Sequence, residues 1–87
     1  MSQVWLYATL RSVTAGKCPV DVQGASVREL VENLDQAYPG AKDALVWGDD
    51  LMHGLAVIVD GETSALGLLQ KVGGNSEVHF LPAIGGG

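Results

Sequence analysis

The chain has 87 residues, which is enough for one small domain with a single hydrophobic core. Because 47% of its residues are hydrophobic and 17% are charged, it is expected to fold rather than to remain disordered. Ten acidic and five basic side chains give a net charge of −5, which argues against nucleic acid and anionic membranes as partners and favours a basic protein.

Two neighbouring strands are expected at the start of the chain. Side chains alternate in character over residues 3–10, which predicts a strand with one core face and one aromatic face. The expected core face consists of Val4, Leu6, Ala8 and Leu10. Ala15-Gly16 is a turn signal, and residues 17–22 predict a second strand with Cys18, Val20 and Val22 on one face. The short link, which contains glycine, predicts that the two strands form a β-hairpin.

An amphipathic helix is expected next. Ser26 is followed three residues later by Glu29, the spacing of a capping box at a helix start. One apolar stripe at helical spacing consists of Val27, Leu30, Val31, Leu34 and Tyr38. Pro39-Gly40 is expected to end the helix.

The second half of the chain predicts two more strands. Residues 41–54 are mixed in character, with a short strand or turn at 44–47. Residues 55–59 form a continuous apolar run, which predicts a buried strand closed by the Asp60-Gly61 turn. A helical turn is expected at 65–69 and a last strand at 77–81. A helix packed across one face of a mixed sheet of four to five strands buries both apolar surfaces, so we expect an α+β protein with the β-grasp, or ubiquitin-like, fold.

Residues 82–87 are predicted to form a flexible tail beyond a single domain of residues 1–81. The tail ends in Gly85-Gly86-Gly87, and a terminal glycine run adds nothing to the stability of the fold. Because glycine has no Cβ, such a tail can enter the narrow channel of an enzyme that activates the Gly87 carboxylate. Gly87 is therefore a candidate reactive group, and the alternative is an inert tail.

The tail also carries a resemblance to a known family. Phe80-Leu81-Pro82-Ala83-Ile84-Gly85-Gly86-Gly87 resembles the ending of the ubiquitin-like sulfur carriers, which include the small subunit of molybdopterin synthase and the thiamine-pathway sulfur carrier. Leu6–Arg11, with Gly16 just after, resembles the first strand and turn of the molybdopterin-synthase type. Residues 57–61 and 77–82 fall where that family has its later strands, so the resemblance covers nearly the whole chain. The third glycine and segment 41–54 depart from the family pattern.

The resemblance implies a mechanism in which the chain is a carrier and not an enzyme. An adenylating enzyme would use ATP and magnesium to convert the Gly87 carboxylate into an acyl-adenylate. Sulfur from a persulfide donor would then replace AMP and leave a thiocarboxylate. An acceptor biosynthetic enzyme, such as the large subunit of molybdopterin synthase, would take that sulfur. Gly87 and Gly86 would carry the chemistry, and Pro82, Ala83, Ile84 and Gly85 would bind along the partner's channel, while the carrier itself would hold no cofactor.

One face of the sheet is a candidate docking surface. If Val4 and Phe80 meet the helix, then Trp5, Tyr7, His79 and Leu81 share the opposite face. The family has a hydrophobic patch on this face near the tail that meets the activating enzyme, and Tyr7 and Leu81 match those positions. The alternative is that segment 41–54 folds over this face and extends the core.

Two other functions are compatible with the same tail, and a metal site is disfavoured. A ubiquitin-like modifier joined to target lysines through Gly87 would share the same activation, and a carrier for cysteine- or thiamine-type biosynthesis would share the same product. No metal site is expected, because His53 and His79 lack carboxylate or cysteine neighbours at ligand spacing and Cys18 is the single cysteine. Without a signal peptide or an apolar membrane span, the cytoplasm is the expected location.

Overall fold

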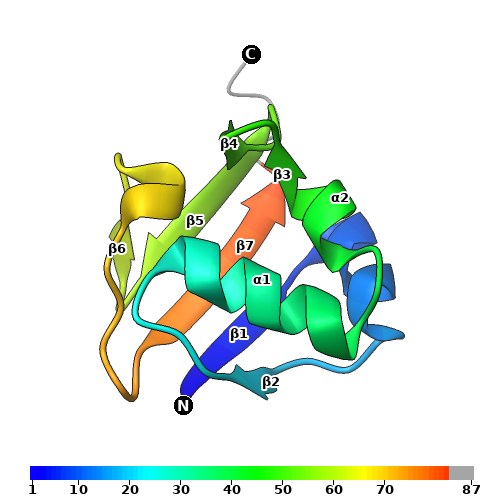
Figure 1. The fold of residues 1–87 in the computed structure, drawn as a ribbon, viewed down its shortest axis with the longest axis horizontal. Coiled ribbons are helices and arrows are strands. Elements are labelled where there is room, and N and C mark those ends of the chain that lie inside the picture. The colour runs from blue at the N-terminus through cyan, green and yellow to red at the C-terminus, as the bar shows by residue number, and fades with distance from the viewer. Residues whose placement is uncertain (83–87) are drawn as a thin grey trace.

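The computed structural model describes residues 1–82 and contains a five-stranded mixed sheet. The strands are β1 (Ser2–Leu6), β2 (Val20–Val22), β5 (Leu55–Val59), β6 (Glu62–Thr63) and β7 (Glu77–Pro82). Their order is β2-β1-β7-β5-β6, as Figure 1 shows for the three central strands. The first and last strands, β1 and β7, are parallel neighbours, and the other pairs are antiparallel.

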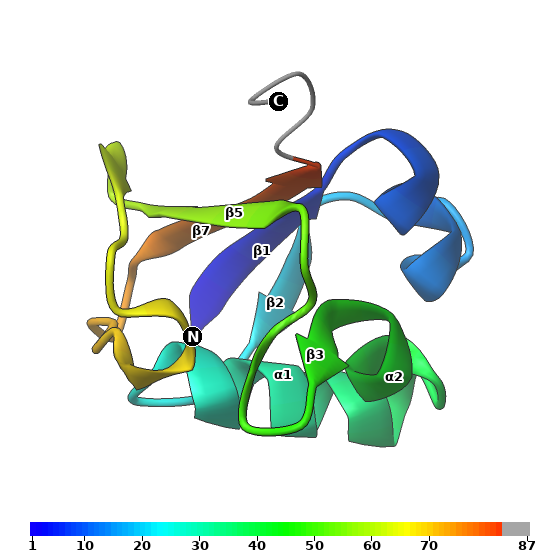
Figure 2. The same ribbon diagram turned by 90° about the horizontal axis from the view of Figure 1, so that it is seen from above.

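Helix α1 (Val27–Ala37) packs across one face of this sheet (Figure 2). Its buried stripe contains Val27, Leu30, Val31 and Leu34, as the sequence predicted. The sheet contributes the alternate residues that point toward the helix, and the most buried of these are Val4, Leu6, Val57, Val78 and Phe80. The alternation of period 2 on the strands and the stripe of period 3.6 on the helix thus meet in one core.

The predicted capping box is present at the start of α1. The Ser26 hydroxyl accepts a hydrogen bond from the Glu29 amide at 3.2 Å. The Glu29 carboxylate reaches back and accepts from the Ala25 amide at 3.1 Å, one residue before the position that the motif usually engages. One amide of the first helical turn, that of Glu29, and the amide of Ala25 just before the N-cap are therefore both paired.

Ser26→Ala is expected to lower the free energy of unfolding by about 1 kcal/mol, because it removes this cap. Urea unfolding of the variant measures the loss. Ser12→Ala is the matched control, because Ser12 is exposed and, among residues 1–82, its hydroxyl bonds only to the Thr9 carbonyl three residues earlier. Equal effects of the two substitutions would contradict a specific contribution from the cap.

The first predicted strand is too long, because the chain turns into a 3-10 helix after Leu6. This helix, η1, spans Ala8–Thr14. The Tyr7 amide still donates to the Phe80 carbonyl of β7, but Ala8 has a φ of 55° and ends the extended conformation. Leu10 remains buried by this route, while Ala8 is exposed and does not belong to the core face that the alternation predicted.

The second predicted strand is also shorter than expected and begins at Val20 instead of Lys17. Val20 and Val22 face the core side as predicted, while Cys18 lies outside the strand and is half-buried. Pro19 has no amide hydrogen to donate to a neighbouring strand, which limits the pairing at this end. The antiparallel pairing with β1 is confirmed, but the connection is long and contains η1.

Segment 41–54 does not cover the far face of the sheet, so that alternative is wrong. It forms α2 (Ala41–Leu45) and a small hairpin of β3 (Val46–Trp47) and β4 (Asp50–Leu51). Figure 2 shows α2 and β3 on the same side of the sheet as α1. Ala41 and Leu45 are buried there, and they extend the core on the helix side.

The predicted Asp60-Gly61 turn joins β5 to β6, a two-residue strand that the sequence did not indicate. Both turn residues have positive φ, 50° and 87°, as a tight two-residue hairpin loop requires. The Asp60 carboxylate also accepts hydrogen bonds from the Glu77 amide at 2.9 Å and the Ser76 hydroxyl at 2.8 Å. One side chain therefore ties this turn to the start of β7.

These hydrogen bonds, first the Glu77 amide and then the Ser76 hydroxyl, hold the pKa of Asp60 below its ordinary value. A lowered folded-state pKa stabilises the fold above the unfolded pKa, and this contribution disappears as pH falls through the folded value. Asp60→Asn is therefore expected to be less stable than the parent at neutral pH. The difference in the free energy of unfolding between the two proteins should shrink as pH falls below about 4, the ordinary pKa of an aspartate, and should disappear below the lowered pKa of Asp60. A constant stability difference from pH 7 to acid would contradict this role of the carboxylate.

The last two elements lie where the sequence predicted them. The helical turn expected at 65–69 is a 3-10 helix, η2 (Gly67–Leu69), and it packs beside α1. Strand β7 covers the predicted 77–81 and includes Pro82. The predicted α+β architecture, with one main helix across a mixed sheet, is confirmed.

Candidate functional site

Of the predicted tail, residues 82–87, the structure describes Pro82. Pro82 was predicted to be the first tail residue, but in the structure it is the half-buried last residue of β7 and pairs in register with Leu55 of β5. Ala83, Ile84, Gly85, Gly86 and Gly87 lie outside the described residues. Their roles as channel-binding and reactive residues therefore stay predictions. The structure does fix which strand leads to them, and that strand carries His79 and Leu81.

The predicted docking residues gather on the face of the sheet opposite α1. Trp5 and His79 are partners in the parallel register of β1 and β7, and their rings stack with centroids 4.6 Å apart and planes 11° apart. The Tyr7 ring also stacks with the His79 imidazole, with centroids 5.7 Å apart and planes 13° apart. His79 thus joins the two aromatic residues into one surface. We call Trp5, Tyr7, Ile58, His79 and Leu81 the outer face.

One hydrogen bond and one longer polar contact fix the orientation of the imidazole within this stack. The Tyr7 hydroxyl and His79 Nδ1 are 2.6 Å apart, and His79 Nε2 lies 3.5 Å from Glu77 Oε1. When Nδ1 accepts the hydroxyl proton, the ring carries its own proton on Nε2, which points to the Glu77 carboxylate. The rings are therefore held by polar contacts at their edges while their faces provide apolar area.

A shallow hollow of about 300 Å³ adjoins the stack. It is lined by Tyr7, Ile58, Gly61, Glu77, His79 and Leu81. Ile58 pairs in register with His79 across β5 and β7, and sequence reasoning did not assign it to this face. The signal was present, because Ile58 lies between the buried Val57 and Val59 and must therefore point the other way.

The outer face has the properties of a docking surface. Neither α1 nor α2 covers it (Figure 2), and Tyr7 is 39% exposed. It combines two aromatic rings, aliphatic side chains and a hydrogen-bonded histidine, a composition found in the buried centres of protein interfaces. It also leads directly into Pro82, so a protein bound here would lie beside the start of the tail.

Other candidate sites have less support. Within residues 1–82, no three side chains among His, Cys, Asp and Glu are placed to hold a metal ion. His53 is exposed and distant in sequence from His79, whose ring is engaged by its stacking partners. In the part of the chain that the structure describes, no helix is both long and apolar enough to span a lipid bilayer.

The fold and this face define a ubiquitin-like β-grasp protein. The family model of the ThiS family matches residues 4–87, and the chain belongs to this family of ubiquitin-like sulfur carriers. Among curated proteins, none matches the sequence at a significant level.

Solved structures of similar small proteins match this chain over nearly its full length. A chain in the crystal structure of the BexX/CysO complex from Amycolatopsis orientalis is 29% identical, with a TM-score of 0.89 and full coverage of both chains. The small archaeal modifier protein 1 from Haloferax volcanii is 30% identical, with a TM-score of 0.71 over 99% of this chain and 98% of that one. CysO from Mycobacterium tuberculosis, at 22% identity, shares the fold with a TM-score of 0.86 over 97% of this chain and 100% of that one.

Proposed function

We propose that this protein carries sulfur as a thiocarboxylate on Gly87 and delivers it to a biosynthetic enzyme. The observation that carries the proposal is the family match, which runs from residue 4 through Gly87 and so includes the glycine tail. The outer face supports it, because an aromatic surface at the base of the tail suits a partner that must hold the carrier while it acts on the end of the chain.

The chemistry proceeds through acyl activation on the partner enzyme. The Gly87 carboxylate attacks the α-phosphorus of ATP, with magnesium on the phosphates, and pyrophosphate leaves. The terminal sulfur of a persulfide donor then attacks the carbonyl carbon of the acyl-adenylate and displaces AMP. A thiol reduces the resulting acyl disulfide, which leaves the thiocarboxylate and a new disulfide. The carrier supplies the acyl group and the docking surface, and the partner supplies the catalytic groups.

For the acceptor, the sequence resemblance favours a molybdopterin synthase large subunit. The similarity to a chain of the BexX/CysO complex supports a different partner equally well. A carrier of this fold can serve either, because the docking surface and the tail are separate from the chemistry of the acceptor. In each case the tail must enter an active site that another protein provides.

The test is intact-mass spectrometry after incubation with an adenylating enzyme, ATP, magnesium and a persulfide donor. The expected product has one oxygen replaced by sulfur, and a thiol-selective label should map to the C-terminal peptide. The Cys18→Ala variant serves as the control, because it removes the other thiol in the chain. An unmodified carboxylate under these conditions would reject the sulfur-carrier proposal.

The second candidate function is a protein modifier joined to lysines through Gly87. It is favoured by the 30% identity to small archaeal modifier protein 1 over 99% of this chain. Both functions share the acyl-adenylate and differ in the nucleophile that displaces AMP, which is the terminal sulfur of a persulfide in one case and a lysine amine in the other. Gly87-linked lysine peptides in an extract of cells that make the protein would favour the modifier.

A further inference from the structure

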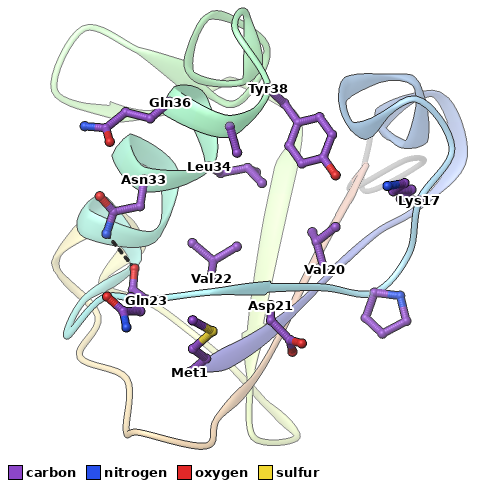
Figure 3. A pocket seen from close by; sticks show the side chains of 12 residues that line it. Met1, Lys17, Val20, Asp21, Val22, Gln23, Asn33, Leu34, Gln36 and Tyr38 are labelled. Atoms are coloured by element: carbon purple, nitrogen blue, oxygen red, sulfur yellow. Dashed lines mark hydrogen bonds between the residues drawn. The ribbon is translucent and has the colours of Figure 1, made fainter.

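A second surface lies on the other side of the molecule, between β2 and the last turns of α1. This open groove has a volume of about 600 Å³. Figure 3 shows it from close by. Val20 and Val22 point into it from β2, and Leu34 and Tyr38 point into it from the helix end. Amide side chains and Lys17 stand around this apolar floor, while the Asp21 carboxylate points away from the helix.

Strand β2 is an edge of the sheet, and its free side borders the groove. Gln3 pairs in register with Asp21, and the Gln3 amide donates to Ser76 on the opposite side. Gln3 and Asp21 are therefore a non-hydrogen-bonded pair of the antiparallel ladder, in which the N–H and C=O of each residue point away from the other residue. The N–H and C=O of Asp21 therefore face outward at the free edge.

On each side of Asp21, one backbone hydrogen-bonding group of the edge is missing or already engaged. Pro19 offers no amide hydrogen, and the Gln23 carbonyl already accepts a hydrogen bond from Asn33 Nδ2 at 2.7 Å. Among residues 19, 21 and 23, which face this edge, Asp21 is therefore the one that offers both its N–H and its C=O to a partner. An extended peptide backbone is the chemical group that satisfies both at once.

A second copy of the chain does not fit this edge. Symmetric antiparallel pairing about Asp21 would place two carboxylates directly opposite each other, which is destabilising. A shift in one direction pairs Asp21 with Pro19, which lacks a donor. A shift in the other direction pairs it with Gln23, whose carbonyl is occupied. The net charge of −5 adds repulsion between copies.

We propose that this edge binds an extended segment of a partner protein with the pattern apolar–basic–apolar. The segment adds a strand to β2, and its central residue exchanges two backbone hydrogen bonds with Asp21. The Lys or Arg side chain of that residue lies opposite the Asp21 carboxylate on the outer side of the sheet. Its two neighbours point to the helix side, because side chains alternate along a strand, and they fill the apolar groove floored by Leu34 and Tyr38.

The proposal is tested by NMR titration of the ¹⁵N-labelled full chain with two synthetic peptides. One is acetyl-Gly-Thr-Val-Arg-Val-Thr-Gly-amide, and the other has Glu in place of Arg. The arginine peptide is expected to shift amides of residues 17–23 and 33–38 saturably and to slow hydrogen exchange of the Asp21 amide. Its affinity should exceed that of the glutamate peptide by about two- to tenfold, since one cross-strand charge pair becomes repulsive.

Two variants at exposed positions make the test specific. Asp21→Lys should reverse the preference, so that the glutamate peptide binds more tightly than the arginine peptide. Ala37→Arg should weaken both peptides, because it places a long side chain over the groove. Neither residue is in the core, so both variants are expected to keep the parent spectrum elsewhere.

Several results would overturn the proposal. These are the absence of saturable shifts, shifts confined to the outer face, equal affinities for the two peptides, or unchanged exchange of the Asp21 amide on binding. Concentration-dependent shifts of β2 without peptide would mean that a second copy occupies the edge instead. Since the titration needs neither ATP nor an activated Gly87, its outcome is independent of the sulfur-carrier test.

Discussion

Removal of Gly86 and Gly87 is expected to abolish conversion of the chain end to an acyl-adenylate while leaving the fold intact. The core is built from residues up to Phe80, and Pro82 is the last residue paired in the sheet. Loss of the two glycines should therefore change the free energy of unfolding by no more than about 0.5 kcal/mol. Pyrophosphate release with the activating enzyme measures the first quantity, and urea unfolding measures the second.

The single substitution Gly87→Ala is a finer version of the same experiment. It keeps a terminal carboxylate and adds only a Cβ, so a block in activation would show that the partner's channel requires glycine. Gly74→Ala is the matched control, because a Cβ at Gly74 meets nothing within 4 Å. Normal pyrophosphate release by the truncated chain would reject Gly87 as the reactive group, and a defect in Gly74→Ala would show that the assay reports something else.

The parts of the fold that could be predicted are those set by local pattern. The capping box at Ser26, the helix stripe and the alternation in β7 each depend on residues a few positions apart. The strand predicted over residues 3–10 fails after Leu6, because a 3-10 helix buries Leu10 as well as a continued strand would. The short elements of segment 41–54 depend on packing against α1, a non-local contact that alternation cannot reveal.

The outer face and the groove at β2 likewise depend partly on local pattern and partly on contacts between distant parts of the chain. Placing Trp5 and Tyr7 on the face opposite the core required only period-2 alternation. Their stacking on His79 depends on the parallel register of β1 and β7, which joins residues from the two ends of the chain. The groove at β2 depends on a strand being an edge, a property of the whole sheet, and no local pattern in the sequence indicated it.

Leu81→Ala is expected to weaken recognition by the activating enzyme by about thirtyfold, the loss typical of a residue at the centre of an interface. Leu81 lines the hollow on the outer face and lies one residue before Pro82, the last residue of β7, after which the tail begins. A truncated side chain there removes apolar contact area close to the point where the tail must enter the partner. Steady-state kinetics of pyrophosphate release against carrier concentration measure the effect.

Leu69→Ala is the matched control, because Leu69 is 71% exposed on η2, which packs beside α1 on the opposite side of the sheet. Docking precedes the attack on ATP, so Leu81→Ala should raise KM for the carrier and leave kcat nearly unchanged. Equal kinetics for the two variants would remove the outer face as the docking surface. A fall in kcat alone would mean that Leu81 positions the tail rather than holding the partner.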